Sequence, residues 1–190
     1  VGSEMCIRDR AYTHGLLHSE RPWCREPVVK FLCPAPGYDR HFKVTESFGL
    51  ELVTIPMTDE GPDMDAVEKA IQDPAVKGMW NVPKYSNPTG VTYSEETVRR
   101  LATCKAAPDF RIVWDNAYAV HDLTDDGDEL ANIFDIAREA GNEDRILGVA
   151  STSKITFPGA GIAFFGSSPA NVVEVANTLK VGLISANKLN

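Results

Sequence analysis

Lys154 is the residue of this sequence best suited to covalent chemistry, because it lies in a turn between the apolar runs 146–150 and 162–165. An amine just beyond a buried strand can be partly desolvated, which leaves some of it neutral and able to attack a carbonyl. The hydroxyls of Ser151 and Ser153, with backbone N–H groups, could hold a phosphate. Covalently bound pyridoxal phosphate requires both features, whereas a solvated surface lysine is the alternative for this motif alone.

Asp115 is a second candidate, because it follows the strand-like residues 111–114 and so ends a predicted buried strand. A buried carboxylate needs a cationic partner. A protonated pyridine nitrogen would be such a partner, and keeping it charged lets the ring accept electrons from a carbanion. Tyr118 follows three residues later, so its phenol could reach the same ligand. A turn or capping role for Asp115 and simple packing for Tyr118 remain alternatives.

Two turns rich in proline and glycine carry the other candidates. Tyr38 follows Pro-Gly and could stack on a flat heteroaromatic ligand. His41 could lie beside Asp115 and support it, although a purely structural histidine is the alternative. Asn87, within the Ser-Asn-Pro-Thr-Gly turn 86–90, could donate to a phenolic oxygen of a cofactor ring. It could equally cap its own turn.

Short apolar runs alternate with helical patterns between residues 28 and 180, which predicts an α/β fold. Asp63, Ser94 and Ser168 are expected to cap helices, and Gly141 to end one. Strands that alternate with helices imply crossover connections, hence a mostly parallel sheet with helices on both faces in three layers. The predicted strands are 28–32, 50–55, 78–82, 110–114, 146–150 and 162–165, and the predicted helices are 64–71, 95–105, 130–140 and 169–180.

This topology predicts where the chemistry lies. In open α/β sheets, the functional site lies beyond the carboxyl ends of the strands. Tyr38, Asn87, Asp115 and Lys154 each follow or end a predicted strand. We therefore expect the four side chains to converge on one edge of the sheet.

The bulk composition excludes several classes of function. The chain has 190 residues, a net charge of −8 and a pI near 5.0, which argues against a nucleic-acid partner. No apolar run approaches the roughly 20 residues that span a bilayer. The four cysteines show neither a CxxC pair nor zinc spacing, so we expect reduced thiols in a cytoplasmic protein and no metal site.

Four motifs together resemble the central large domain of fold-type I pyridoxal-phosphate enzymes. They are residues 36–38, 86–90, 115–118 and 151–154, with 28 residues from Asn87 to Asp115 and 39 from Asp115 to Lys154. The fuller wording of residues 33–42, 114–121 and 152–161 resembles the bacterial aspartate aminotransferase subgroup that is similar to the MocR-type aminotransferases.

The resemblance implies a role for each candidate residue. Lys154 would form the internal aldimine with pyridoxal 5'-phosphate and shuttle a proton during transamination, and Asp115 would pair with the pyridinium. Tyr118 and Asn87 would hydrogen-bond the phenolic oxygen of the ring. Tyr38 would stack on the ring, supported by His41 near Asp115, and Ser151 and Ser153 would contact the phosphate. Substrates would be an amino acid, by resemblance aspartate, and a 2-oxo acid such as 2-oxoglutarate, with the enzyme a homodimer.

The chain also departs from the pattern of the family. Gly161 occupies the place where many relatives carry a phosphate-binding arginine. We expect residues 1–10 to be a non-native extension, because they show neither a signal-peptide core nor a helical stripe. Residues 11–190 would then be an incomplete pyridoxal-phosphate-binding large domain without its N-terminal phosphate loop and C-terminal small domain, inactive alone.

Other functions remain open for the same residues. One is another reaction on this scaffold, such as a decarboxylase or a β-lyase, or the aminotransferase-like half of a transcription regulator. Another is a non-catalytic α/β binding module. Activity of the full-length protein on aspartate and 2-oxoglutarate would separate the first group, and substoichiometric cofactor would favour the last.

Overall fold

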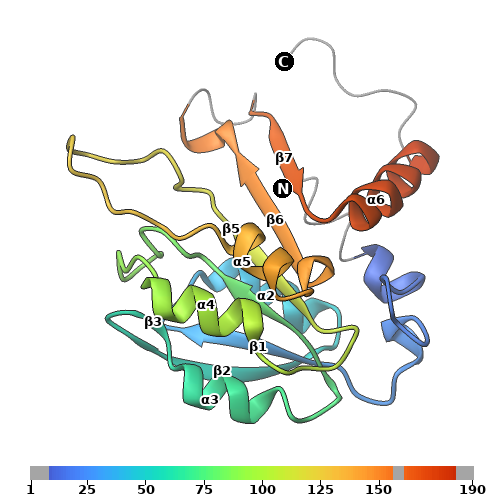
Figure 1. The fold of residues 1–190 in the computed structure, drawn as a ribbon. Coiled ribbons are helices and arrows are strands. Elements are labelled where there is room, and N and C mark those ends of the chain that lie inside the picture. Colours follow the sequence, from blue (N-terminus) through green and yellow to red (C-terminus); the bar gives the residue numbers. More distant parts are fainter. Residues whose placement is uncertain (1–8, 156–160, 183–190) are drawn as a thin grey trace.

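A single sheet organises the chain. The computed structural model describes residues 9–155 and 161–182, and seven strands form this sheet within those ranges. In sheet order they are β3 (Gly61–Pro62), β2 (Glu51–Thr58), β1 (Lys30–Ala35), β4 (Val76–Asn81), β5 (Arg111–Asp115), β6 (Ile146–Ser151) and β7 (Ala163–Gly166). The five central strands are parallel, and the edge strands β3 and β7 are antiparallel to their neighbours. The predicted mostly parallel α/β sheet is confirmed (Figure 1).

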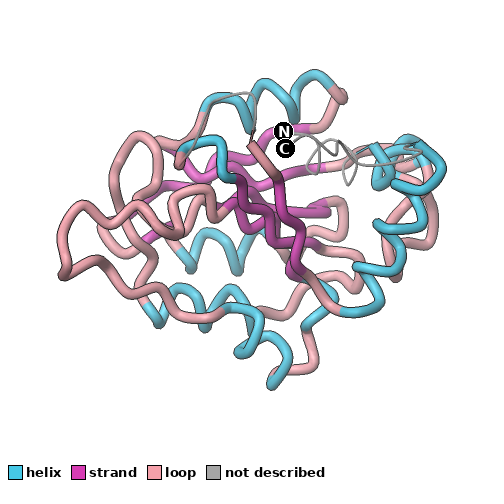
Figure 2. Tube along the Cα trace, turned by 90° about the horizontal axis from the view of Figure 1, so that it is seen from above, coloured by secondary structure: helices cyan, strands magenta, loops and turns pink. Residues whose placement is uncertain are grey.

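Helices cover both faces of the sheet, which gives the predicted three layers (Figure 2). One face carries α3 (Met64–Ala70), α4 (Glu95–Thr103) and α5 (Ile133–Glu139), and the other carries α2 (Asp39–Ser47), α6 (Pro169–Gly182) and the N-terminal segment. Neighbouring strand residues point to opposite faces, so Leu32 and Met79 enter one core while Phe31 and Trp80 enter the other. Full burial of such an apolar side chain contributes about 1.5–3 kcal/mol.

The predicted helix caps form local hydrogen bonds. The Asp63 carboxylate accepts from the N–H groups of Asp65 and Ala66 at the start of α3, and Ser94 Oγ accepts from Thr97 N at 3.2 Å at the start of α4. Ser168 Oγ accepts from Asn171 N at 3.2 Å at the start of α6. These three caps are confirmed because each depends on neighbours in the sequence.

Several predicted boundaries are displaced by up to three residues, and two of them show the cause. Helix α5 begins at Ile133 rather than Leu130, because the Asn132 side chain accepts from Phe134 N and caps it there. Gly141 ends this helix with φ +70°, as predicted. Strand β1 continues to Ala35, beyond the expected end at residue 32, because its pairing with β2 extends that far.

Helix α2 and the short strand β3 are not among the predicted elements. Pro36 and Gly37 dominate the local pattern and indicate a turn. The helix that follows is fixed largely by tertiary contacts, since His41 and Thr45 are buried and Thr45 Oγ1 accepts from Trp80 Nε1 at 2.9 Å. Tertiary packing therefore decides the state of a segment that local propensity leaves open.

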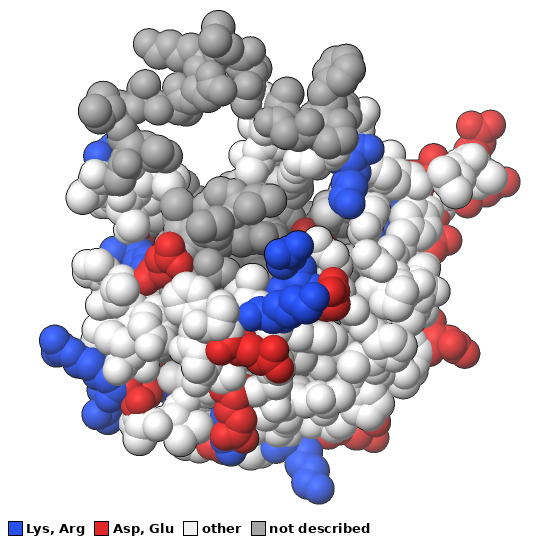
Figure 3. Space-filling view, turned by 180° about the vertical axis from the view of Figure 1, so that it is seen from behind, with Lys and Arg blue, Asp and Glu red and all other residues white. Residues whose placement is uncertain are grey.

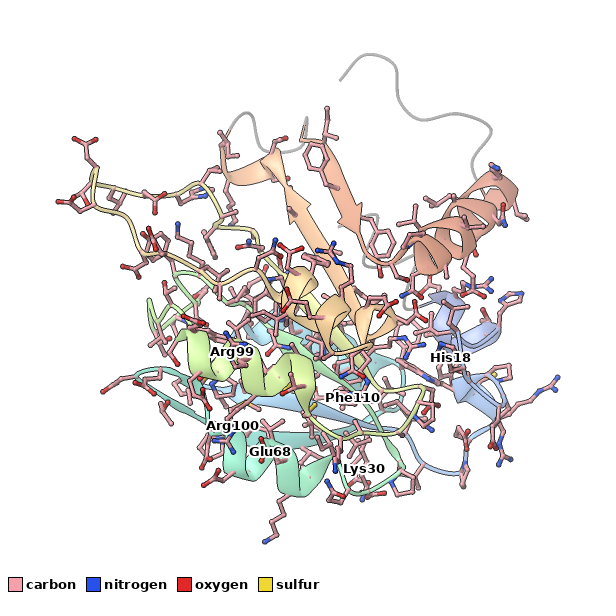
Figure 4. All side chains as sticks on the ribbon, in the orientation of Figure 1. His18, Lys30, Glu68, Arg99, Arg100 and Phe110 are labelled. Carbon is pink, nitrogen blue, oxygen red and sulfur yellow. The ribbon has the colours of Figure 1, made fainter. Side chains whose placement is uncertain are left out.

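Acidic and basic side chains are interspersed on the surface. Figure 3 shows this for one face, where blue and red groups lie beside each other. On the α3–α4 side, Arg100 Nε lies 2.9 Å from Glu68 Oε1 (Figure 4). Within the two described ranges, no helix has the length and apolar character needed to cross a membrane.

Candidate functional site

The carboxyl ends of the parallel strands form one edge of the sheet, and the predicted site residues lie along it. Tyr38 follows β1, Asn87 follows β4, and Asp115 ends β5. Lys154 lies three residues beyond the end of β6, the strand paired with β5. The backbone therefore places the four residues at a shared edge, as expected. Which of these residues interact depends on the positions of their side chains.

Asp115 and His41 form the centre of this edge. The Asp115 residue is 9% exposed, and its Oδ2 lies 3.2 Å from His41 Nε2. The His41 ring is stacked on Trp80, with ring centroids 4.3 Å apart and planes 9° apart. The aromatic stack fixes the imidazole, so the buried carboxylate has one defined neighbour. The sequence predicts this His41–Asp115 contact, whereas the stacking role of Trp80 is missed.

Tyr38 contacts the same imidazole. It occupies the N-cap position of α2, and its ring meets the His41 ring edge-on at 5.1 Å between centroids. Tyr38 is 36% exposed. Part of the residue is therefore accessible to solvent or to a ligand.

Lys154 lies on a short 3-10 helix, η3 (Thr152–Lys154), directly after β6. Its ammonium is 6.0 Å from the centroid of the Tyr118 ring. The side chain is exposed, which differs from the partial desolvation expected from the sequence. Lys154 ends η3 at the surface, and the Tyr118 ring lies near its ammonium.

The hydroxyl groups before Lys154 form a local pair. Ser151 Oγ donates to Ser153 Oγ at 2.6 Å and accepts from Ser153 N at 3.0 Å, which caps η3. Both serine side chains are half-buried. Gly161, at the place of the expected arginine, lies with its hypothetical Cβ 2.6 Å from Ser153 Oγ, so only glycine fits there without a shift. Residues 156–160, which share that motif, lie outside the described residues.

Asn87 is the predicted residue that the structure leaves most separate. It is exposed at the tip of a turn closed by Ser86 N donating to Val91 O at 2.9 Å. Within the described residues its amide has no hydrogen-bond partner. The turn therefore presents the Asn87 amide to solvent or to a ligand, and the capping alternative for this side chain is not observed.

His121 is a residue of this edge for which the sequence predicts no role. Its Nε2 lies 3.3 Å from the carbonyl oxygen of Lys154, and its ring meets the Tyr118 ring edge-on at 5.4 Å. Its Nδ1 is buried, with no hydrogen-bond partner among the described residues. The sequence signals for it were its position three residues after Tyr118 and its place at the end of the motif 114–121.

The residue types at this edge fit pyridoxal phosphate. Asp115 Oδ1 has no hydrogen-bond partner among the described residues and could accept from a protonated ring nitrogen. Lys154 supplies an accessible amine, and the Ser151–Ser153 pair supplies hydroxyl donors for a phosphate. Within the described part of the chain, no group of three or more His, Cys, Asp or Glu side chains could hold a metal ion.

Comparisons with known proteins show the family to which the chain belongs. The family model described as aspartate amino-transferase matches residues 4–190. An aspartate aminotransferase of Corynebacterium glutamicum is 50% identical over 181 residues, which is 95% of this chain and 42% of that protein. The chain therefore spans less than half the length of this curated relative.

Solved structures of aminotransferases are similar to this chain. An aspartate transaminase from Corynebacterium glutamicum superimposes with a TM-score of 0.94 at 48% identity, covering 97% of this chain and 44% of that one. An α-aminoadipate aminotransferase of Thermus thermophilus, complexed with N-(5'-phosphopyridoxyl)-L-leucine, superimposes with a TM-score of 0.68 at 27% identity. It covers 81% of this chain and 39% of that chain.

Proposed function

Because this chain belongs to the aspartate amino-transferase family, we propose that the protein containing it is a pyridoxal-phosphate-dependent aminotransferase that moves an amino group between an amino acid and a 2-oxo acid. The single observation that carries the proposal is the His41–Asp115 contact, 3.2 Å long, at the sheet edge that also holds Lys154. A buried carboxylate held by an imidazole and open on its other oxygen suits a charged ring nitrogen.

Each residue along the edge would contact a different part of the cofactor. Asp115 would accept a hydrogen bond from the protonated ring nitrogen, and Tyr38 would cover the ring. Tyr118 and Asn87 would donate to the phenolic oxygen of the ring. The hydroxyls of Ser151 and Ser153 would donate to the phosphate, with the backbone N–H groups of η3 nearby, and contacts from these six side chains would fix the orientation of the ring.

The chemistry then depends on one amine. When bound, pyridoxal phosphate supplies an electron-withdrawing ring that stabilises negative charge at the α-carbon of the substrate. Lys154 would hold the cofactor, and its amine would move a proton to and from that α-carbon. His121 supports this step by keeping its Nε2 against the carbonyl oxygen of Lys154.

Aspartate and 2-oxoglutarate are the substrates we propose, because the Corynebacterium glutamicum relatives are described as aspartate aminotransferases. We further propose that the protein is cytoplasmic and that it is a homodimer. The cytoplasmic location is supported by the three described cysteines, Cys24, Cys33 and Cys104, which are free thiols, as is usual in a reducing compartment. Size-exclusion chromatography with light scattering would test the dimer, and a monomeric holoenzyme would contradict it.

Absorbance of the purified full-length protein tests the central assignment. We expect a near-visible band with bound cofactor that disappears in Lys154→Ala, together with activity on aspartate and 2-oxoglutarate. Lys180→Ala, which removes a lysine of α6 away from this edge, is the matched control and should keep the band. A band that survives Lys154→Ala, or no band in the unsubstituted protein, would falsify the proposal.

A further inference from the structure

A cluster of polar contacts outside the predicted site joins the segment before Asn87 to the segment after Tyr118. Lys84 Nζ lies 2.7 Å from Asp122 Oδ1, and Tyr85 Oη donates to the same oxygen at 2.6 Å. We call Lys84, Tyr85 and Asp122 the polar clamp. One carboxylate oxygen thus accepts from two consecutive residues of the other segment.

Two further contacts strengthen this connection, and a third lies between Lys84 and Tyr85 themselves. Lys84 Nζ also lies 3.4 Å from the carbonyl oxygen of Ala119, the residue directly after Tyr118. The same ammonium lies 5.1 Å from the centroid of the Tyr85 ring. Asp128 N donates to Tyr85 Oη at 3.0 Å, which attaches the far end of the loop. Both ends of the loop after Tyr118 are therefore tied to two adjacent side chains.

The two sides of the clamp differ in how much other support they have. On the Asn87 side, Ser86 N donates to Val91 O at 2.9 Å and Tyr93 N donates to Pro83 O at 2.8 Å, so the turn that carries Asn87 is closed on itself. Lys84 leads into this closed turn from the end of β4. A displacement of Lys84 therefore moves the turn as a unit.

On the Tyr118 side, the loop has little apolar support. Val120 is 66% exposed and Leu123 is 98% exposed. Figure 1 shows this segment leaving the body of the domain after β5 and returning before α5. Because so little apolar surface holds the loop, polar contacts with the rest of the chain must fix it.

Burial makes the clamp stronger than an ordinary surface ion pair. The Lys84 side chain is only 8% exposed, and that of Asp122 is 36% exposed. Hydrogen bonds from Lys84 and then from Tyr85 hold the pKa of the Asp122 carboxyl below its usual value, so the carboxylate stays ionised at neutral pH. A carboxylate that accepts from a buried ammonium and from a phenol has a more defined geometry than a pair of two exposed side chains.

We propose that Lys84, Tyr85 and Asp122 are positioning residues that hold the Asn87 turn and Tyr118 in a fixed relation, and thereby set the hydrogen bonding at the phenolic oxygen of the bound cofactor. The inference rests on the proposed function, because it assigns Asn87 and Tyr118 to the same oxygen. None of the three clamp residues needs to touch the cofactor or the substrate.

The test is a pH titration of the absorbance of the cofactor bound to the full-length protein. Hydrogen bonds to the phenolic oxygen stabilise its ionised form, so losing them raises the apparent pKa of the absorbance change. We expect a rise of about one pH unit in Lys84→Met and Asp122→Ala, the effect of losing roughly one hydrogen bond to a charged group. Asp122→Asn keeps an acceptor oxygen and should shift less.

Lys77→Met is the matched control. Lys77 forms an ion pair of the same length, 2.7 Å, with Asp109, and Lys77, like Lys84, is largely buried, with its side chain 11% exposed. This pair lies at the opposite, amino-terminal side of the sheet, so its loss should lower stability and leave the titration unchanged. Tyr85→Phe removes a single hydroxyl and provides a mild variant in case Lys84→Met does not fold.

The possible outcomes separate the two proposals. If the unsubstituted protein has no cofactor band that depends on Lys154, the proposed function fails and the clamp inference fails with it. If that band is present but Asp122→Ala and Tyr85→Phe titrate like the unsubstituted protein, only the clamp inference is overturned. An equal shift in Lys77→Met would also overturn it, since the effect would then follow from general destabilisation.

Discussion

His41 Nε2 lies 3.2 Å from Asp115 Oδ2, and 74 residues of chain separate the two. The imidazole comes from α2 and the carboxylate from the end of β5, so the contact exists only after the sheet has formed. The stack of His41 on Trp80 leaves the ring little rotational freedom. Removing the hydrogen-bond partner of such a buried carboxylate costs free energy, because the carboxylate is left unpaired.

Replacing His41 by Phe should therefore weaken cofactor binding while preserving the aromatic stack on Trp80. The variant leaves Asp115 without its hydrogen-bond partner, and a loss of about tenfold in affinity corresponds to one such bond to a charged group. Titration of the cofactor-free full-length protein with pyridoxal phosphate measures this. His14→Gln is the control, because His14 lies exposed outside the site. Equal affinities of His41→Phe and the unsubstituted protein would contradict the supporting role.

Gly78→Ala should destabilise the fold strongly, because β4 has no room for a side chain at this position. An added Cβ would lie 2.4 Å from the Phe31 ring and 3.0 Å from the Arg111 carbonyl oxygen. Overpacking of this kind costs about 1–3 kcal/mol, which is a drop of several degrees in the unfolding midpoint. Gly166→Ala is the control, since its Cβ would meet nothing closer than 3.9 Å. Thermal unfolding followed by circular dichroism compares the two, and similar midpoints would refute the argument.

Cys33 should resist alkylation in the native protein, because burial in β1 raises the pKa of its thiol to about 12. Cys24 is exposed and should be modified first. Mass spectrometry of peptides after maleimide treatment at pH 8 would distinguish the two sites. Labelling of Cys33 as fast as Cys24 before unfolding would show that the thiol is accessible.

The same pKa shift predicts a pH dependence of stability. The folded-state pKa of Cys33 is raised above the unfolded value of roughly 8.5. Its contribution to stability is therefore fully present below about pH 8.5 and is lost as the pH rises toward about 12. Cys33→Ala should unfold with a flatter dependence on pH over this range. Urea unfolding at pH 8 and pH 10 measures this dependence. An equal change in unfolding free energy between the two pH values in Cys33→Ala and in the unsubstituted protein would count against a buried, protonated thiol.

Much of the local structure could be predicted from the sequence, because it depends on neighbours along the chain. The caps at Asp63, Ser94 and Ser168 act within four residues, and their side chains bond the backbone that follows. The mostly parallel sheet follows from strands that alternate with helices, since each crossover helix returns the chain to the edge of the sheet where the previous strand began. Local signals also placed Asp115 at the end of β5 and Lys154 just after β6.

Other features depend on parts of the chain that are far apart in sequence. The stack of His41 on Trp80 and the contact of Lys84 with Asp122 join segments whose spacing carries no periodic signal. Helix α2 was missed for the same reason, because its buried face is defined only by the strand it covers. Propensity and periodicity describe single segments and do not encode which side chains meet between them.

The exposure of Lys154 shows most directly what could not be predicted from the sequence. The residue types alone determined that an amine, two hydroxyls and a strand-end carboxylate would lie at one edge, because parallel strands bring their carboxyl ends together. Only the tertiary structure decided that His41 holds Asp115, that Lys154 faces Tyr118 from the surface, and that Lys84 ties the loop to the turn. Packing sets these relations, because each needs a third element, Trp80, η3 or the closed turn, to hold one partner in place.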